Sequence, residues 1–547
     1  MHPEVGSLSS IGAWGTQPGN CARDLQRLFL KEVKLAQPVG VKVKWLDSKR
    51  QQAQGEIDAA MLLPHLLFSS LFKYDEALVE HVLGLSQIKS FWDQVPTDDP
   101  RLFENPVLAL PHYKETVLPI WIHGDGVAYG ERDSLMVFSW GSFLTNIGAL
   151  DSSFYIASWP KHCTQKPSAA SLGTWSNMMK VMCWSFQALL QGVHPLVNWD
   201  GTDWVDGSLE SQLAGTALAP NNLKVVVWGL LGDQEYFANT LGLPHWSKAQ
   251  FCWHCNACRG DAQRSPWDIG TEAGWAYNTP QMEKESPSSM HAFFQELPGV
   301  SCFHVCLDVL HVLDLGVVKH LLGSALKHLV YHQLRHARLP PAQALASIWE
   351  RLVELYEEFQ VPTRLSNLYL SMFCNPKAPH ASYPELEAKA AEMRHFLPVV
   401  TVLMGEYNRG TDDQQHRFHA CQQLALAYQV LDREPMFMSQ GASSECIKLY
   451  KGFWASYSWL NEWCSGQGWL GYNIVSKHHM GLHLMQQGKY MNPRLAWTYK
   501  AESWVGSLSA LAHSTSFGTK GYRLSWKVAE KYRMMLHLRL VRPQFYD

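Results

Sequence analysis

The sequence predicts an α/β fold, in which a mixed β-sheet packs against helices and a large, mostly α-helical insertion interrupts the sheet domain. Three observations lead to this fold class. Two apolar runs on either side of a short turn predict a β-hairpin from Val117 to Trp140. A β-branched run from Lys224 to Leu231 is typical of a strand that is buried on both faces. The chain from about Val305 to Leu431 then has the apolar pattern of a series of helices.

The predicted elements of the sheet domain follow one another in the order strand, strand, strand, helix, strand. After the hairpin, a short apolar run from Phe154 to Ser158 predicts the third strand. An amphipathic helix is expected from Thr174 to Gln191, and Gly192 stands at its end. The fourth strand ends in Gly232 and Asp233. Because ligand chemistry in α/β sheets gathers at strand ends, acids at these ends are candidates for a functional site.

The length of 547 residues suggests about three or four domain-sized units. The patterns divide the chain into four regions. These are a helical and irregular amino-terminal region (1–110), the first part of the sheet domain (111–250), a cysteine-containing and mostly helical insertion (251–476), and the closing helices of the sheet domain (477–547).

The bulk composition limits the classes of partner and compartment. The net charge is −3, so a nucleic-acid partner needs a local basic surface rather than a basic field over the whole chain. Twelve cysteines in so long a chain lack the density of a disulfide scaffold, which favours a reducing compartment, the nucleus or the cytosol. We expect no signal peptide, because the amino-terminal stretch lacks a charged segment before an apolar core, and no membrane span.

Three acids form the candidate catalytic site. Asp125 lies between two glycines on the first strand of the hairpin, Asp233 follows the fourth strand, and Glu502 lies on a helix predicted from about Trp497 to Ala512. Divalent cations such as Mg²⁺ prefer oxygen ligands, and convergent carboxylates can hold two ions for phosphoryl transfer. Each acid also has a simpler explanation: a turn residue for Asp125, a helix N-cap for Asp233 and a surface helix residue for Glu502.

Cys252, Cys255 and Cys258 form a compact cysteine cluster with the spacing of a zinc site. A Cys-x2-Cys pair brings two sulfurs to one tetrahedral ion, and we therefore expect a structural Zn²⁺ on these three thiolates. The alternative is a set of buried thiols without a metal. The sequence leaves the fourth ligand open among four candidates: His254, His304, Cys302 and Cys306.

Two further groups of polar side chains lie on predicted helices. Asp308 and His311 are spaced i, i+3, so they lie on one helical face, where burial requires them to have partners. They pair with each other, with a metal or with the active site, and a plain Asp–His pair that stabilises the core is the alternative. His479 and His483 are spaced i, i+4. This spacing allows a metal pair, a face that contacts phosphate, or a packed histidine face.

These residues together resemble the eukaryotic cut-and-paste DDE/D transposases, and within them the CACTA and Kyakuja-Dileera-Zisupton branch. Members of that branch have a large helical insertion between the second and third acids. They also have a Cys or Asp, two intervening residues and a His after the second acid, which Asp308-Val309-Leu310-His311 matches. The segment from Lys477 to Glu502 is similar to the closing region of the family, where a Lys/His-rich helix precedes the last acid. The resemblance covers about Val117 to Lys520.

The resemblance implies an RNase H-like catalytic core and metal-dependent DNA strand cleavage and transfer. Asp125, Asp233 and Glu502 would hold two Mg²⁺ or Mn²⁺ ions, with Asp308 and His311 supporting the site. The implied partner is DNA, both transposon ends and target, in the nucleus, and a homo-oligomer is one possible assembly. The sequence departs from the pattern, since it has no recognisable amino-terminal DNA-binding module and a slightly acidic net charge.

These departures keep two alternatives open. One is a catalytically inactive, domesticated DNA- or protein-binding factor that retains the fold. The other is an unrelated, zinc-stabilised helical scaffold in which the acids are incidental.

Overall fold

The structure, a computed structural model, describes residues 17, 20–47, 52–130, 133–165, 173–270, 273–279, 292–334, 339–516 and 519–541. The stretch 1–16, on which the expectation about a signal peptide rests, lies outside the described residues. No helix in the described ranges combines the length and the apolar character that crossing a membrane requires.

Six strands form one mixed sheet in the order β1-β2-β5-β4-β3-β6. Neighbouring strands are antiparallel except for β3 and β6, which run parallel. The sheet confirms the predicted α/β class and the order of three strands, a helix and a strand over β3 to β6. The strands are β1 (Val39–Asp47), β2 (Gln52–Met61), β3 (Val117–Ala128), β4 (Ser134–Ser142), β5 (Phe154–Pro160) and β6 (Lys224–Gly232).

Residues 1–110 were expected to be helical and irregular. The structure instead has two strands in this region, β1 and β2, which extend the central sheet beyond β5. Val41 and Val43 are 2% and 1% exposed, whereas Lys42 and Lys44 between and after them are exposed. This alternation is the period of a half-buried strand. The lysines obscure this alternation in the sequence, because they make the segment look charged throughout.

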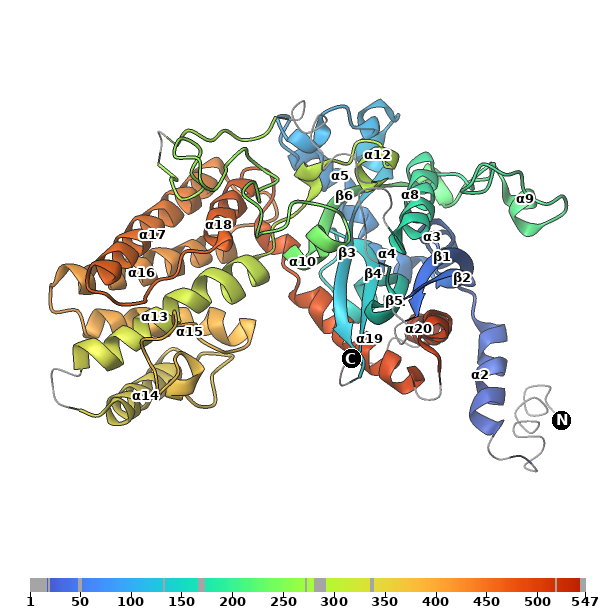
Figure 1. The fold of residues 1–547 in the computed structure, drawn as a ribbon. Coiled ribbons are helices and arrows are strands. Elements are labelled where there is room, and N and C mark those ends of the chain that lie inside the picture. Colours follow the sequence, from blue (N-terminus) through green and yellow to red (C-terminus); the bar gives the residue numbers. More distant parts are fainter. Residues whose placement is uncertain are drawn as a thin grey trace.

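Helices cover both faces of the sheet, since every residue of the central strand β5 and of β6 is buried. Helix α8 (Trp175–Gln191) packs against β6 and β1, and α20 (Leu524–Val541) packs against β5 and β2. Helix α19 (Tyr499–Ser516) returns from the helical region to contact β3 (Figure 1). Segments from both ends of the chain therefore complete one core.

A separate group of helices lies beside the sheet, on the left in Figure 1. It begins with a π-helical stretch, η9 (Leu310–Val318), which continues into α13. Helices α16 and α17 pack against each other, and α18 packs against both α17 and η9. The group comprises α13 (Lys319–His328), η10 (Leu329–Gln333), α14 (Pro341–Glu358), α15 (Ala390–Glu406), α16 (Asp412–Arg433), α17 (Gln440–Gly466) and α18 (Ser476–Gln487).

Shorter helices connect these elements. They are α2 (Cys21–Glu32), α3 (Pro64–Leu71), α4 (Glu76–Leu83), α5 (Ile88–Gln94), α6 (Tyr113–Thr116), α7 (Ala149–Ser152), α9 (Leu209–Leu213), α10 (Gln234–Asn239) and α12 (Ala292–Glu296). Of these, α10 matters most for the site, because it begins directly after β6.

Candidate functional site

The parallel pairing of β3 and β6 brings the first two acids to neighbouring positions, Asp125 on β3 and Asp233 directly after β6. Gly124 of β3 pairs with Gly232 of β6, and the next residue in each strand direction is Asp125 and Asp233 respectively. The ring of Tyr236, on α10, packs over both glycines. A Cβ at Gly124 would lie 2.1 Å from that ring, and one at Gly232 would lie 2.4 Å from it. The glycines therefore allow α10 to start close to the strand ends.

Asp233 is the N-cap of α10, as its simpler explanation predicted. Its Oδ1 accepts a hydrogen bond from the Tyr236 N–H at 2.6 Å, which satisfies one of the free amides at the helix start. The capping role uses one oxygen and fixes the direction of the carboxylate. Capping and a metal-binding role are therefore compatible for this residue.

Glu502 joins the two aspartates from the first turn of α19, and we call these three residues the acidic centre. Burial, together with the negative charges of Glu502 and Asp233, raises the pKa of Asp125 to about 8. The carboxyl groups of Asp125 and Glu502 are close enough to share a hydrogen bond. The three carboxylates are thus neighbours, although their oxygens do not all lie within 4.8 Å of one another.

Asp308 is buried at the start of η9 and has both oxygens occupied. Oδ1 accepts from the backbone N–H groups of Leu310 and Thr498, each at 3.0 Å. Oδ2 accepts from the Thr498 hydroxyl at 2.7 Å and pairs with Nδ1 of His311 at 2.6 Å. Such a saturated carboxylate positions its neighbours and has no lone pair directed at a metal in the acidic centre.

His311 connects Asp308 to the acidic centre. Burial lowers the pKa of His311, but the hydrogen bond and charge of Asp308 outweigh this and raise it to about 9. The ring is therefore an imidazolium at neutral pH. Its Nε2 lies 3.8 Å from Oε1 of Glu502, so the cation faces the third acid. Lys477, at the start of α18, adds a second cation that interacts with the charges of Asp233 and Asp308.

A second group of side chains, which could bind a metal ion, lies outside the acidic centre. Cys252, Cys255, His479 and His483, which we call the Cys–His centre, place one ligand atom each within 4.8 Å of one another. All four are buried. This group could bind a metal such as zinc, as the sequence predicted for Cys252 and Cys255.

The composition of the Cys–His centre differs from the predicted set of ligands. Cys258 lies outside it, and its Sγ donates to the carbonyl of Arg259 at 3.5 Å. The two remaining positions belong to His479 and His483 rather than to any of the four candidates for the fourth ligand. The i, i+4 spacing was the available signal, but a packed histidine face gives the same spacing.

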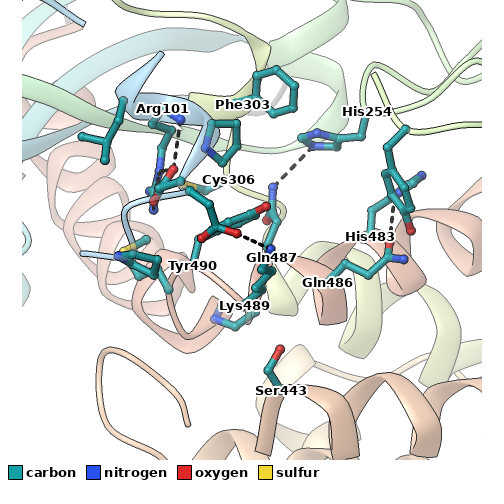
Figure 2. A pocket seen from close by; sticks show the side chains of 18 of the residues that line it. Arg101, His254, Phe303, Cys306, Ser443, His483, Gln486, Gln487, Lys489 and Tyr490 are labelled. Carbon is teal, nitrogen blue, oxygen red and sulfur yellow. Dashed lines mark hydrogen bonds and ion pairs between the residues drawn. The ribbon is translucent and has the colours of Figure 1, made fainter. Parts of the chain in front are cut away.

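A cavity of about 1310 Å³ lies beside the Cys–His centre, and His483 lines it (Figure 2). No member of the acidic centre lines this cavity. Its charged side chains pair with one another: Arg101 with Asp99 at 2.6 Å and Lys489 with Asp98 at 2.5 Å. The cavity and the acidic centre therefore share no residue, and the charged side chains that line the cavity are paired without the three acids.

In comparisons with known proteins, the chain matches no protein-family model and no curated protein.

Proposed function

We propose that the chain is a transposase-derived nuclease with an RNase H-like core, which cleaves and transfers DNA strands by metal-dependent phosphoryl transfer. Its partner would be DNA, as transposon ends and target, and its place of action the nucleus. The convergence of Asp125, Asp233 and Glu502 carries the proposal. These acids come from a strand, a strand end and a distant helix, yet the pKa of Asp125 responds to both other charges.

The topology supports the same proposal. An antiparallel run of β3, β4 and β5 is followed by helix α8 and by β6, which pairs in parallel with β3. This puts the first acid on β3, next to the edge strand β6, and the second acid directly after the end of β6. The third acid arrives on α19 after the large helical region, in the order that the family resemblance implies.

The donor set fits Mg²⁺ or Mn²⁺. Carboxylate oxygens are the ligands that these hard cations take, and crowding of three acids is unfavourable until a cation offsets it. Two such ions, when bound, would activate the attacking oxygen and stabilise the leaving oxygen. Asp125, Asp233 and Glu502 would hold them. Asp308 acts as a positioning residue, since it holds Thr498 at the start of α19 and orients His311 toward Glu502.

The test is nicking of supercoiled DNA in the presence of Mg²⁺ or Mn²⁺. We expect the wild type to nick, and Asp125→Asn, Asp233→Asn and Glu502→Gln to fall to background. Glu235→Gln is the matched control, because Glu235 neighbours Asp233 but is exposed and pairs with Lys161 at 3.3 Å. Equal activity in wild type and all three acid variants would show that the acidic centre is not the catalytic site.

A specific contact favours the second candidate, an inactive DNA- or protein-binding factor that retains the fold. The imidazolium of His311 already faces Glu502, and it competes with a metal ion for that carboxylate. The two candidates differ in Mn²⁺ binding measured by calorimetry. The nuclease requires Mn²⁺ binding that Asp125→Asn abolishes, whereas the inactive factor would bind its DNA or protein partner without binding the ion.

A further inference from the structure

We propose that Cys252, Cys255, His479 and His483 hold one Zn²⁺ in a closed structural site, which fixes helix α18 to the loop that follows α10. The inference stands independently of DNA cleavage. It rests on the geometry of the four ligand atoms, on the hydrogen bonds of the two histidine rings and on the chemistry of the surroundings.

The separations within the Cys–His centre match a tetrahedral zinc site. Nε2 of His479 lies 3.0 Å from Nε2 of His483 and 3.2 Å from Sγ of Cys255. With zinc–nitrogen bonds of about 2.0–2.1 Å, two imidazoles on one tetrahedral ion have their nitrogens about 3.3 Å apart. The ligand atoms therefore already have nearly the spacing that one ion would impose.

The hydrogen bonds of the histidines leave lone pairs facing one another. Nδ1 of His479 lies 2.8 Å from the carbonyl oxygen of Pro266, and Nδ1 of His483 lies 3.1 Å from Oε1 of Gln486. Both partners are acceptors, so each Nδ1 carries the proton and each Nε2 presents its lone pair to the other ligand atoms of the centre. Two lone pairs at 3.0 Å repel each other unless a cation lies between them. Acceptors that orient the far nitrogen are also the usual outer partners of metal-bound histidines.

The ligand chemistry selects zinc and a structural role. Two thiolates and two neutral imidazoles around Zn²⁺ give a centre with no net charge, which suits burial among aromatic rings. Trp275 and Tyr277 lie against His483 with ring centroids 5.6 Å and 5.0 Å away. Because all four tetrahedral positions are taken by side chains, none remains for a water or substrate.

The centre joins segments that are far apart in sequence. Cys252 and Cys255 belong to the loop after α10, whereas both histidines belong to α18. At the end of α18, the side chain of Gln487 bonds to the backbone of Val305 and Leu307, each at 3.0 Å. The zinc site therefore holds the helix whose two ends approach the acidic centre and the Asp308 segment.

The first experiment measures zinc in the purified full-length chain by inductively coupled plasma mass spectrometry. We expect one zinc ion per chain in the wild type and loss of it in Cys255→Ser and His483→Ala. Cys258→Ser and His254→Ala are the matched controls, since both residues lie next to the site but outside it, and both should retain zinc. Loss of zinc in Cys258→Ser, with retention in His483→Ala, would overturn this ligand set in favour of a three-cysteine site.

A second measurement covers the case in which the ligand variants fail to fold. Wild type prepared with Co²⁺ instead of Zn²⁺ should show thiolate-to-cobalt charge transfer and the visible bands of tetrahedral cobalt, and Zn²⁺ should abolish them. Hydrogen exchange of the α18 amides should become faster when a chelator removes the metal. A folded wild type that takes up neither metal would overturn the site, and unchanged exchange after metal removal would overturn its role in fixing α18.

Discussion

The carboxylate of Asp308 accepts two hydrogen bonds from Thr498, which lies 190 residues further along the chain. The first comes from the backbone N–H at 3.0 Å and the second from the hydroxyl at 2.7 Å. Both residues are buried, with exposed fractions of 2% and 1%. This pair ties the start of η9 to the start of α19, and thereby sets where Glu502 stands.

Thr498→Val should destabilise the protein by about 1–3 kcal/mol, because it removes one of the hydrogen-bond donors to the buried, charged carboxylate of Asp308. The free energy of unfolding measured with denaturant checks this. Thr202→Val is the matched control, since the Thr202 hydroxyl also donates to an aspartate, Asp200, at 2.6 Å but on the surface. The control should change stability by less than about 0.5 kcal/mol. Equal losses in both variants would contradict the importance of the buried pair.

Gly124→Ala should destabilise the protein by about 1–3 kcal/mol, because the added methyl group would overlap the ring of Tyr236. Gly506→Ala on α19 is the matched control, since nothing lies within 4 Å of a Cβ there. It should stabilise the helix by up to about 1 kcal/mol. Thermal and denaturant unfolding measure both changes. If Gly124→Ala were as stable as the wild type, Tyr236 would not limit the approach of α10 to the strands.

The buried carboxyl group of Asp314 should make the free energy of unfolding depend on pH. Burial raises the pKa of its carboxyl from 3.8 to about 7, against hydrogen bonds from the hydroxyls of Tyr428 and Tyr499. Below about pH 4 the group is protonated in both the folded and the unfolded chain. Between about pH 4 and about pH 7 the unfolded chain has lost this proton, whereas the folded chain keeps it. The contribution of this group to the free energy of unfolding therefore falls as the pH rises through this range.

Asp314→Asn removes this titration. Its free energy of unfolding, relative to the wild type, should therefore rise with pH by up to about 1.4 kcal/mol per pH unit over that window and level off above it. Urea unfolding at a series of pH values measures the difference. A difference that does not vary between the acidic and the neutral end of the series would show that Asp314 titrates normally.

His311→Gln should bind Mn²⁺ more tightly than the wild type, because it removes a positive charge 3.8 Å from Glu502. Calorimetric titration with Mn²⁺ alone gives the affinity. His162→Gln serves as the control, since His162 also faces a carboxylate, Asp133, at 3.3 Å, but on another part of the surface. Weaker binding in His311→Gln would mean that His311 organises the acidic centre for the ion rather than competing with it.

Much of the sheet domain could be predicted from local patterns. The runs that became β3, β4, β5, α8 and β6 were each apparent in a few neighbouring residues, and so were Asp125 and Asp233 at their places near strand ends. Strands β1 and β2 were missed, because the exposed lysines of β1 concealed the alternation of Val41 and Val43. The i, i+4 spacing of the α18 histidines fits both a packed face and a metal pair, so the local sequence does not decide between them.

Local sequence thus decides which segments become strands or helices, since backbone preference and apolar periodicity act over a few residues. It also marks the cysteine pair, because two ligands of one ion can be neighbours in the chain. Only the folded chain decides which distant groups meet. His479 and His483 complete the Cys–His centre, and Thr498 brings Glu502 to the aspartates, because proximity in space depends on the packing of whole helices and sheets rather than on separation in sequence.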